Sequence, residues 1–356
     1  MNIIAENSLT AQKLWQEHAE FVESMPEHLC VYAGTVYNLR CAMCLQHGAP
    51  KATLVPSGPK FFDLALLDSL SVPFSKATFL EFHGTCEPFI TKRFWELVEF
   101  AQKCSSDTTT RRVCILTNGN YEPTEKILEL ATGDSIRKIT FSVDASHENT
   151  YKFIRDGNFS LLLKTMKAIV KKRNLKSLKN DIKIWSTFVM MRSNINEILD
   201  HVKMMSALGI DTIEISSLIR PDKDLLDSWV VKRNLGRSFI YKDEMNIDSK
   251  KVKVIIENAQ SIAQKYGINL IYSGILFGQL IKSQPSKCWW PYKSAFISTA
   301  GEVFPCCYNM SSPMGSLKKN TFSAIWNNNL YRQMRRDMAQ DRLPIMCQGR
   351  NCPFSG

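Results

Sequence analysis

Short runs of β-branched and aromatic residues alternate with longer stretches of helical periodicity through the first two thirds of the chain, and this alternation limits the folds that it can adopt. The pattern predicts strands over residues 29–36, 77–83, 112–117, 137–144, 182–191 and 211–217. Between them it predicts helices over 62–71, 91–105, 124–132, 158–174 and 194–208. Strand–helix units in series favour a parallel sheet with crossover helices. The sequence therefore predicts an α/β fold that closes partly into a barrel, with its site in the loops after the strands.

The same pattern divides the 356 residues into four segments. Residues 1–28 are expected to form an N-terminal helical extension, and residues 29–218 the barrel core. The pattern breaks over 219–247, which we interpret as a linker or lid, and a closing helix near 248–266 completes a segment that ends at 286. Residues 287–356 concentrate Cys, Pro and Gly, as expected for a small second domain.

Composition and charge exclude several classes of protein. The formal net charge is +11, but eight of the cations lie within 164–183, where no aromatic residue is interleaved, so a solvated helix face is favoured and a nucleic-acid partner is not expected. No apolar run reaches the length of a membrane span, and residues 1–28 lack the pattern of a signal peptide. We therefore expect a cytoplasmic protein without a membrane partner. Its 11 cysteines are expected to be metal ligands, because the cytosol keeps thiols reduced.

Two cysteines follow the first predicted strand in the sequence Cys41-Ala42-Met43-Cys44. Thiols three positions apart in a tight loop can hold one metal ion or one edge of an iron–sulfur cluster. Two other interpretations stay open, since the pair can also be a redox dithiol or two small buried side chains.

A second group of cysteines occupies the C-terminal segment. Four soft ligands in a small, loop-rich region are typical of a closed iron–sulfur or zinc site that contributes folding energy. Spacing alone does not separate zinc from a cluster. Cys307 is adjacent to a member of the group and is treated as a spare thiol. The predicted set is Cys288, Cys306, Cys347 and Cys352.

Further motifs follow the other strands in a fixed order: Gly84-Thr85-Cys86-Glu87-Pro88, Thr117-Asn118-Gly119, Ser142-Val143-Asp144-Ala145 and Arg155-Asp156-Gly157. The tail adds Gly301, Met314-Gly315-Ser316-Leu317, Trp326 and Arg335. Together with the two cysteine groups, these motifs resemble the radical S-adenosylmethionine (SAM) enzymes that carry a C-terminal SPASM or shorter twitch domain. The resemblance covers about residues 29 to 354. It implies a partial (β/α)6 TIM-like barrel followed by a small Cys-rich domain.

The resemblance also implies cofactors, a reaction and roles for individual residues. A [4Fe–4S] cluster held by the Cys41–Cys44 loop would cleave SAM, and the enzyme would then abstract a hydrogen atom from a peptide or small anionic substrate, as an oxidoreductase or maturase. A flavodoxin- or ferredoxin-like reductase would supply the electron. An auxiliary [4Fe–4S] cluster would bind the tail cysteines. The residues expected to contact SAM are Met43 (adenine), Gly84, Cys86 and Glu87 (ammonium), and Ser142, Asp144 and Arg155 (ribose and carboxylate).

One departure from the family pattern bears on activity. The first cysteine of the family's Cys-x3-Cys-x2-Cys loop is Tyr37 here. Three interpretations are open. In the first, the Tyr37 phenolate completes the metal site. In the second, the loop has lost its cluster and the chain is a binding scaffold that retains only the tail cluster; in the third, the tyrosine is an engineered change or a sequence error. Cys30 is not expected to substitute, because seven extended residues place it roughly 20 Å away. Cys86 is a second departure, since it replaces the last glycine of the Gly-x-Gly-Glu-Pro loop.

Overall fold

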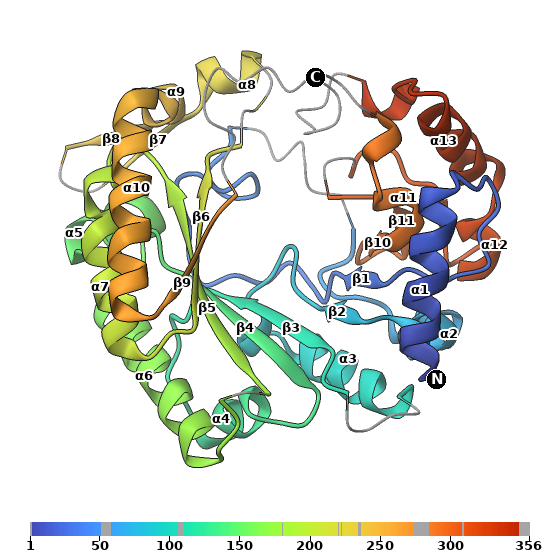
Figure 1. Ribbon diagram of the computed structural model, residues 1–356, viewed down its shortest axis with the longest axis horizontal. Helices are drawn as coiled ribbons and strands as arrows, with labels where there is room; N and C mark the ends of the chain where they lie inside the picture. Colours follow the sequence, from blue (N-terminus) through green and yellow to red (C-terminus); the bar gives the residue numbers. More distant parts are fainter. Residues whose placement is uncertain are drawn as a thin grey trace. The chain divides into compact units, whose positions relative to one another are not determined.

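The computed structural model describes residues 2–50, 58–105, 110–179, 181–219, 221, 223–233, 236–273, 285–307 and 310–348 (Figure 1). The predicted ligand Cys352 lies outside the described residues. The chain divides into two compact units. The first combines residues 1–36, 54–114 and 280–356, and the second combines residues 37–53 and 115–279.

Parallel strands form the core of the first unit. Strand β1 (His28–Val31) pairs in parallel with β2 (Phe79–Glu81) on one side and with β10 (Ser294–Ile297) on the other. Strand β2 also pairs in parallel with the start of β3 (Val113–Thr117). Strands β11 (Glu302–Phe304) and β12 (Gly315–Ser316) continue from β10 with antiparallel pairing. A strand of the C-terminal segment therefore extends the sheet that the N-terminal part of the chain begins.

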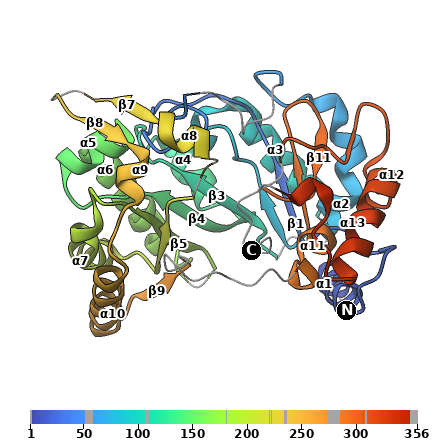
Figure 2. The same ribbon diagram turned by 90° about the horizontal axis from the view of Figure 1, so that it is seen from above.

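Helices and short 3-10 turns surround these strands. Helix α1 packs against α11, and both lie beside α13 in Figures 1 and 2. Asn2 begins α1 because its side chain accepts a hydrogen bond from the Ile4 amide, which satisfies one of the free amides of the first turn. The helices of this unit are α1 (Ile3–Gln16), α2 (Ser71–Lys76), α3 (Lys92–Lys103), α11 (Trp290–Lys293), α12 (Phe322–Trp326) and α13 (Asn329–Ala339), with 3-10 turns η1 (Leu64–Leu70), η2 (Pro88–Ile90), η4 (Pro285–Lys287) and η5 (Ile345–Cys347).

In the part of the second unit that the structure describes, parallel strands pair in the order β4, β5, β6 and β9. Their bounds are β4 (Ile136–Ser142), β5 (Lys183–Met190), β6 (Thr212–Ser217) and β9 (Asn269–Tyr272). Helices cover the outer face of these strands in Figure 1, with α7 directly beside α10. They are α4 (Glu125–Ala131), α5 (Glu148–Arg155), α6 (Phe159–Leu175), α7 (Ile198–Leu208) and α10 (Ser249–Tyr266), with η3 (Ile195–Glu197) before α7.

The segment 219–247 is built from short regular elements. It contains α8 (Lys223–Ser228), the antiparallel pair β7 (Val230–Lys232) and β8 (Ser238–Ile240), and α9 (Tyr241–Met245). The hairpin lies beside α5 in Figures 1 and 2. The ring centroids of Phe153 in α5 and Phe239 in β8 are 5.9 Å apart. This segment is therefore packed onto the second unit.

The helix expected over 62–71 is corrected by the structure. Residues 64–70 form the 3-10 turn η1, and the α-helix begins only at Ser71. Asp63 caps this turn by accepting a hydrogen bond from the Ala65 amide at 3.0 Å, which favours a tight start to the helical stretch. Hydrophobic periodicity alone does not distinguish the two kinds of helix in a segment this short.

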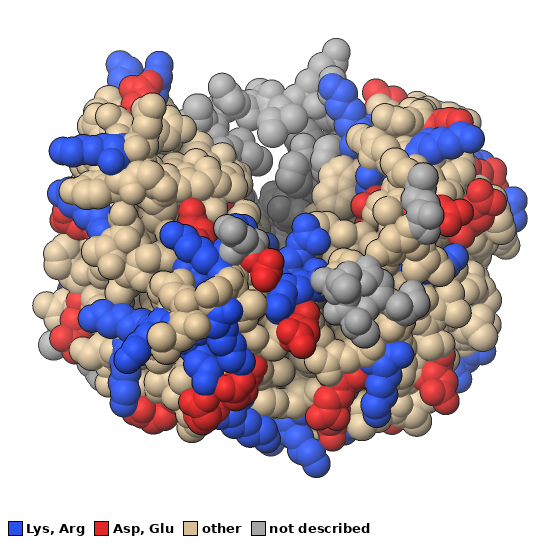
Figure 3. Space-filling view, turned by 60° about the horizontal axis from the view of Figure 1, so that its bottom comes forward, with Lys and Arg blue, Asp and Glu red and all other residues tan. Residues whose placement is uncertain are grey.

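The basic run on α6 is paired with acidic residues in α4 and in the chain just before it. Lys164 contacts Glu122 at 2.6 Å, and Lys176 contacts Glu129 at 2.7 Å. On the face displayed in Figure 3, acidic side chains lie among the basic ones. The run is thus a solvated helix face with surface ion pairs.

Candidate functional site

The loop that carries the two adjacent cysteines lies in the second unit and forms a tight turn. The Cys44 amide donates a hydrogen bond to the Cys41 carbonyl at 3.2 Å, and the Gln46 amide donates to Cys44 Sγ at 3.4 Å. Both thiols are half-buried. Amide hydrogen bonds to sulfur stabilise thiolate ligands of iron–sulfur clusters. The turn thus gives the Cys44 sulfur a hydrogen-bond donor from the backbone.

The backbone on both sides of Cys41 is anchored from distant parts of the chain. The Ala42 amide donates to the Ile154 carbonyl at 2.8 Å, and the Ala42 carbonyl accepts from the indole of Trp229 at 2.9 Å. The preceding carbonyl, that of Arg40, accepts from the guanidinium of Arg233 at 2.6 Å. Trp229 and Arg233 both belong to the segment that the sequence suggested as a linker or lid. This segment therefore fixes the cysteine loop in place.

A buried ion pair stands next to the first thiol. Arg155, the last residue of α5, donates from Nη1 to Cys41 Sγ at 3.6 Å, and its Nη2 pairs with Oδ2 of Asp144. Burial raises the pKa of Cys41, and the Arg155 guanidinium opposes that shift. Arg155 Nε is buried without a hydrogen-bond partner among the described residues. The guanidinium thus keeps one donor for an acceptor beyond the ion pair.

Asp144 is held rigidly just after β4. It is fully buried and has φ +60°, an uncommon backbone conformation for a residue other than glycine. Its Oδ1 accepts from the Val189 amide at 2.7 Å, and its backbone carbonyl accepts from Asn194 at 2.9 Å. Burial raises the pKa of Asp144, while Arg155 lowers it. Both carboxylate oxygens are engaged within the protein, so the carboxylate orients Arg155.

Tyr37 begins the cysteine loop and contacts His47, which none of the predicted motifs includes. The Tyr37 and His47 rings meet edge to face, with centroids 5.0 Å apart. Burial lowers the pKa of His47, with a smaller contribution from Arg40, which favours the neutral imidazole, the form that binds metals. The spacing Cys41-x2-Cys44-x2-His47 is a signal that could have identified this histidine. The loop therefore offers two thiols, a phenol and an imidazole.

Met43 and Ser142 complete the predicted residues of the second unit. Met43 packs against a buried cluster that includes Trp229 and Ile154. Ser142 is the last residue of β4, where it is buried beside Thr187 of β5. Contact of these side chains with SAM stays a prediction.

The Gly84–Pro88 motif lies in the first unit as a compact loop after β2. Gly84 has φ +91°, and a Cβ atom there would lie 2.2 Å from the Tyr32 ring, so this position requires glycine. The Thr85 hydroxyl donates to the Gly34 carbonyl at 2.8 Å, and the amide of the buried residue Glu87 donates to Val36 at 2.8 Å. These bonds hold the motif against the chain that follows β1.

Cys86, at the third position of this motif, is buried. Burial raises its pKa to about 12, so the thiol is neutral. The cysteine thus places a small protonated side chain in the interior of the loop.

Three of the four predicted tail ligands are described, and all three are buried: Cys288, Cys306 and Cys347. Cys288 follows η4, Cys306 follows β11 and Cys347 ends η5. Cys288 contributes to the raised pKa of Tyr292, and Cys306 contributes to that of Tyr331, although burial is the main cause of both shifts. The spare thiol Cys307 is exposed.

The comparisons with known proteins identify the C-terminal region and the fold. Residues 288–353 match the family model of the SPASM domain, described as an iron–sulfur cluster-binding domain. No curated protein matches the sequence. No described helix is both long enough and apolar enough to cross a membrane.

Solved structures resemble nearly the whole chain. The structure of SuiB from Streptococcus suis bound to S-adenosylmethionine has a TM-score of 0.65 at 14% identity, covering 92% of this chain and 71% of SuiB. SuiB bound to the precursor peptide SuiA has a TM-score of 0.64 at 12% identity, covering 92% and 70%. The protein anSMEcpe with bound AdoMet has a TM-score of 0.59 at 14% identity, covering 88% and 82%. At these identities the likeness shows the fold.

The fold is the α/β partial TIM-like barrel that SuiB and anSMEcpe share. The chain combines this barrel with a C-terminal SPASM domain, whose family binds iron–sulfur clusters. Both predictions from the sequence, the fold class and the accessory domain, are confirmed.

Proposed function

We propose that the chain is a radical SAM enzyme that binds a [4Fe–4S] cluster and SAM in the barrel and abstracts a hydrogen atom from its substrate. The observation that carries this proposal is the contact between Arg155 and Cys41. A guanidinium that has one buried donor without a partner among the described residues stands beside a thiol of the loop that resembles the family's cluster-binding loop. Such a donor favours a negatively charged group next to it.

The residues of the cysteine loop fit an iron–sulfur cluster. Cys41 and Cys44 would supply two thiolates, each with a hydrogen bond to its sulfur. Tyr37 would supply the third protein ligand through its phenolate, a harder ligand that also serves haem iron. His47 offers a nitrogen donor in contact with Tyr37 as an alternative. When bound, the cluster supplies the electron for reductive cleavage of SAM.

The residues proposed to hold SAM are those that the sequence motifs suggested. Glu87 and the backbone of Gly84–Cys86 would receive the ammonium group, and Met43 would contact the adenine. Arg155 would bind the carboxylate through its remaining donor, because a guanidinium matches a carboxylate in geometry. Ser142 would contact the ribose. Asp144 would act by fixing Arg155, since both of its carboxylate oxygens are already engaged.

A peptide is the substrate class that we favour, with a small anionic metabolite as the alternative. The fold is shared with SuiB, whose structure has been determined with a precursor peptide bound. An electron donor of the flavodoxin or ferredoxin type would serve the reaction. The tail cysteines, including Cys352, would hold an auxiliary [4Fe–4S] cluster.

Tyr37 favours a second candidate function, that of a binding scaffold without SAM cleavage. In this alternative the phenol only packs against His47, and the tail cluster is the one cluster that the chain retains. The two candidates differ in iron content. Anaerobic reconstitution should give about eight iron atoms per chain for the enzyme and about four for the scaffold.

Substitutions at Tyr37 sharpen this test. Release of 5′-deoxyadenosine is measured for the native chain, for Tyr37→Phe, for Tyr37→Cys and for Tyr266→Phe, a control at the exposed end of α10. We expect the native chain and the control to cleave SAM and Tyr37→Phe to lose both iron and cleavage. If Tyr37→Phe retains both, His47→Gln tests the imidazole as the third ligand. If only Tyr37→Cys cleaves SAM, the proposal that the native chain is an enzyme is wrong and the scaffold alternative is supported.

A further inference from the structure

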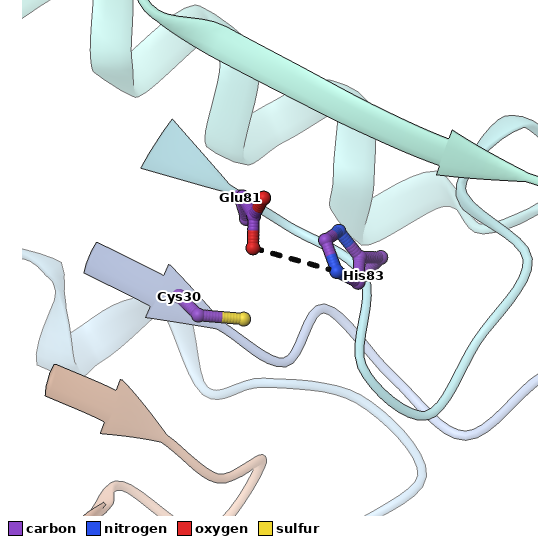
Figure 4. Close-up of side chains that lie close together, drawn as sticks. All are labelled: Cys30, Glu81 and His83. Atoms are coloured by element: carbon purple, nitrogen blue, oxygen red, sulfur yellow. Dashed lines mark ion pairs between the residues drawn. The ribbon is translucent and has the colours of Figure 1, made fainter. Parts of the chain in front are cut away.

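A cysteine, a glutamate and a histidine gather on one face of the first unit's sheet, outside the residues assigned above (Figure 4). Cys30 lies on β1 and Glu81 on β2, and the parallel register places these two residues opposite each other. His83 follows Glu81 by two positions, and residues two apart in extended backbone point to the same side. Register and pleat thus bring three metal-binding side chains together.

The three side chains are close enough to bind one ion. The Cys30 sulfur, a Glu81 carboxylate oxygen and a His83 ring nitrogen all lie within 4.8 Å of one another. His83 Nε2 is 3.5 Å from Glu81 Oε2. Ligand atoms around a tetrahedral zinc ion are about 3.3 to 3.8 Å apart, given zinc–ligand bonds of about 2.0 to 2.3 Å. Side-chain rotations that move these ligand atoms about an ångström closer together would complete such a site.

Burial protects the thiol and leaves a path for the ion. Cys30 is 1% exposed, while the side chains of Glu81 and His83 are 22% and 17% exposed. Burial, and to a lesser degree Glu81, raises the pKa of Cys30. A thiolate and a carboxylate at this distance repel each other unless a cation lies between them. A divalent cation would relieve that repulsion and stabilise both charges.

A second histidine supports the glutamate from outside the group. His28 Nε2 is 2.9 Å from Glu81 Oε2, and His28 lies two positions before Cys30 on β1. The His28 ring is fixed by an edge-on contact with Phe296 at 5.4 Å. Residues that bond to metal ligands orient them and raise metal affinity. His28 is therefore suited to hold the Glu81 carboxylate toward the ion.

We propose that Cys30, Glu81 and His83 form a mononuclear site for a zinc-class divalent transition metal, with His28 as the residue that positions Glu81. Thiolate and imidazole ligands select zinc over magnesium or calcium. Three protein ligands leave the fourth tetrahedral position open, as in catalytic zinc sites. The site can therefore bind a water molecule or a polar group of a substrate at the metal.

Zinc binding by the full chain tests the proposal. The chain is purified anaerobically with its iron–sulfur sites loaded, so that the thiols predicted to bind iron are occupied, and is equilibrated with zinc. Zinc content is measured by mass spectrometry, and the ligand shell by X-ray absorption at the zinc edge, which does not detect iron. We expect about one zinc per chain, with one sulfur and otherwise nitrogen and oxygen ligands.

Variants identify the ligands. Cys30→Ser and Glu81→Gln should each lower zinc affinity at least roughly tenfold, because loss of a ligand costs at least as much as loss of a supporting residue. Cys104→Ser is the matched control, since Cys104 caps α3 and lies outside the group. Circular dichroism confirms that each variant is folded. If Cys30→Ser does not fold, Glu81→Gln decides the result.

Three outcomes would overturn the proposal: no zinc bound by the native chain, equal affinity in the native chain and the folded ligand variants, or a shell of four sulfurs, which would place the zinc at the tail cysteines. The result does not depend on the proposed enzymatic function. A chain that fails to cleave SAM can still bind zinc at these residues.

Discussion

Replacing Arg335 with methionine should destabilise the first unit strongly. Arg335 lies on α13, is 0% exposed, and donates from all three guanidinium nitrogens. Its acceptors are the Pro291 carbonyl at 2.9 and 3.1 Å, the Trp326 carbonyl at 3.0 Å, the Glu20 carbonyl at 3.2 Å and Asn327 Oδ1 at 3.1 Å. Arg335 thus joins α13 to α11, α12 and the chain after α1.

The magnitude follows from these contacts. Methionine has a similar length and helix propensity but no donor, so four acceptors lose the guanidinium. Asn327 Oδ1 keeps the Val22 amide as a donor at 3.0 Å, so three backbone carbonyls bear the penalty. A buried acceptor left without a partner costs about 1–3 kcal/mol, and the lower figure for each of the three gives about 3 kcal/mol in all. The guanidinium also lies 5.0 Å from the Trp326 ring and 5.3 Å from the Tyr331 ring, which adds cation–π stabilisation. Burial lowers the pKa of Arg335 to about 10, which shows that its charge is held at a desolvation cost.

Arg336→Met is the matched control on the same helix. The Arg336 side chain is 41% exposed and pairs with Glu20 at 2.5 Å. An exposed ion pair of this kind contributes less than about 1 kcal/mol. Urea unfolding of the full chain, followed by far-ultraviolet circular dichroism, measures both variants. Equal losses of unfolding free energy in Arg335→Met and Arg336→Met would refute the reasoning.

Two predictions concern the second unit. Burial lowers the pKa of His201 to about 3, against about 6.5 in the unfolded chain, so the unfolded state binds the extra proton and stability falls as pH drops below about 6.5. The expected loss of unfolding free energy at pH 5 is about 2 kcal/mol. The variant His201→Gln should not show this loss. If its unfolding free energy depends on pH as that of the native chain does, the prediction is wrong. Trp229→Phe removes the donor to the Ala42 carbonyl and keeps an aromatic ring on Tyr241. The hydrogen-bonded amides of Ala42 and Cys44 should then exchange with deuterium roughly tenfold faster, at about 1.4 kcal/mol per factor of ten. Native exchange rates would mean that the indole bond does not hold the loop.

The strands that the sequence predicted correctly are those whose side chains are buried by the parallel sheet. The run over 182–191 became β5 (Lys183–Met190), and 211–217 became β6 (Thr212–Ser217). Strands β9 and β10 were not predicted. Each has only four residues, and a short apolar run of this kind is also compatible with a turn or the end of a helix. Their pairing with β6 and β1 depends on tertiary contacts.

The candidate site was predictable where residues are close in sequence. The spacing of Cys41 and Cys44 identified the loop, but nothing in the sequence pairs Cys41 with Arg155, 114 positions away. Trp229 contacts the same loop across 187 positions. The group of Cys30, Glu81 and His83 becomes visible only when the register of β1 and β2 is known. Long-range register and packing, which a single sequence does not encode locally, decide these contacts.

The contacts around Cys41 favour the enzyme over the scaffold, despite Tyr37. A fully buried carboxylate with strained backbone costs free energy in the ligand-free protein. So does a buried guanidinium donor that has no partner among the described residues. Asp144 and Arg155 offset each other in charge, but their pairing leaves the Arg155 Nε donor unsatisfied. A scaffold that binds nothing in this loop would be more stable with an apolar pair of similar volume. An anionic ligand at Arg155 satisfies the donor, so the arrangement is one that SAM binding would stabilise.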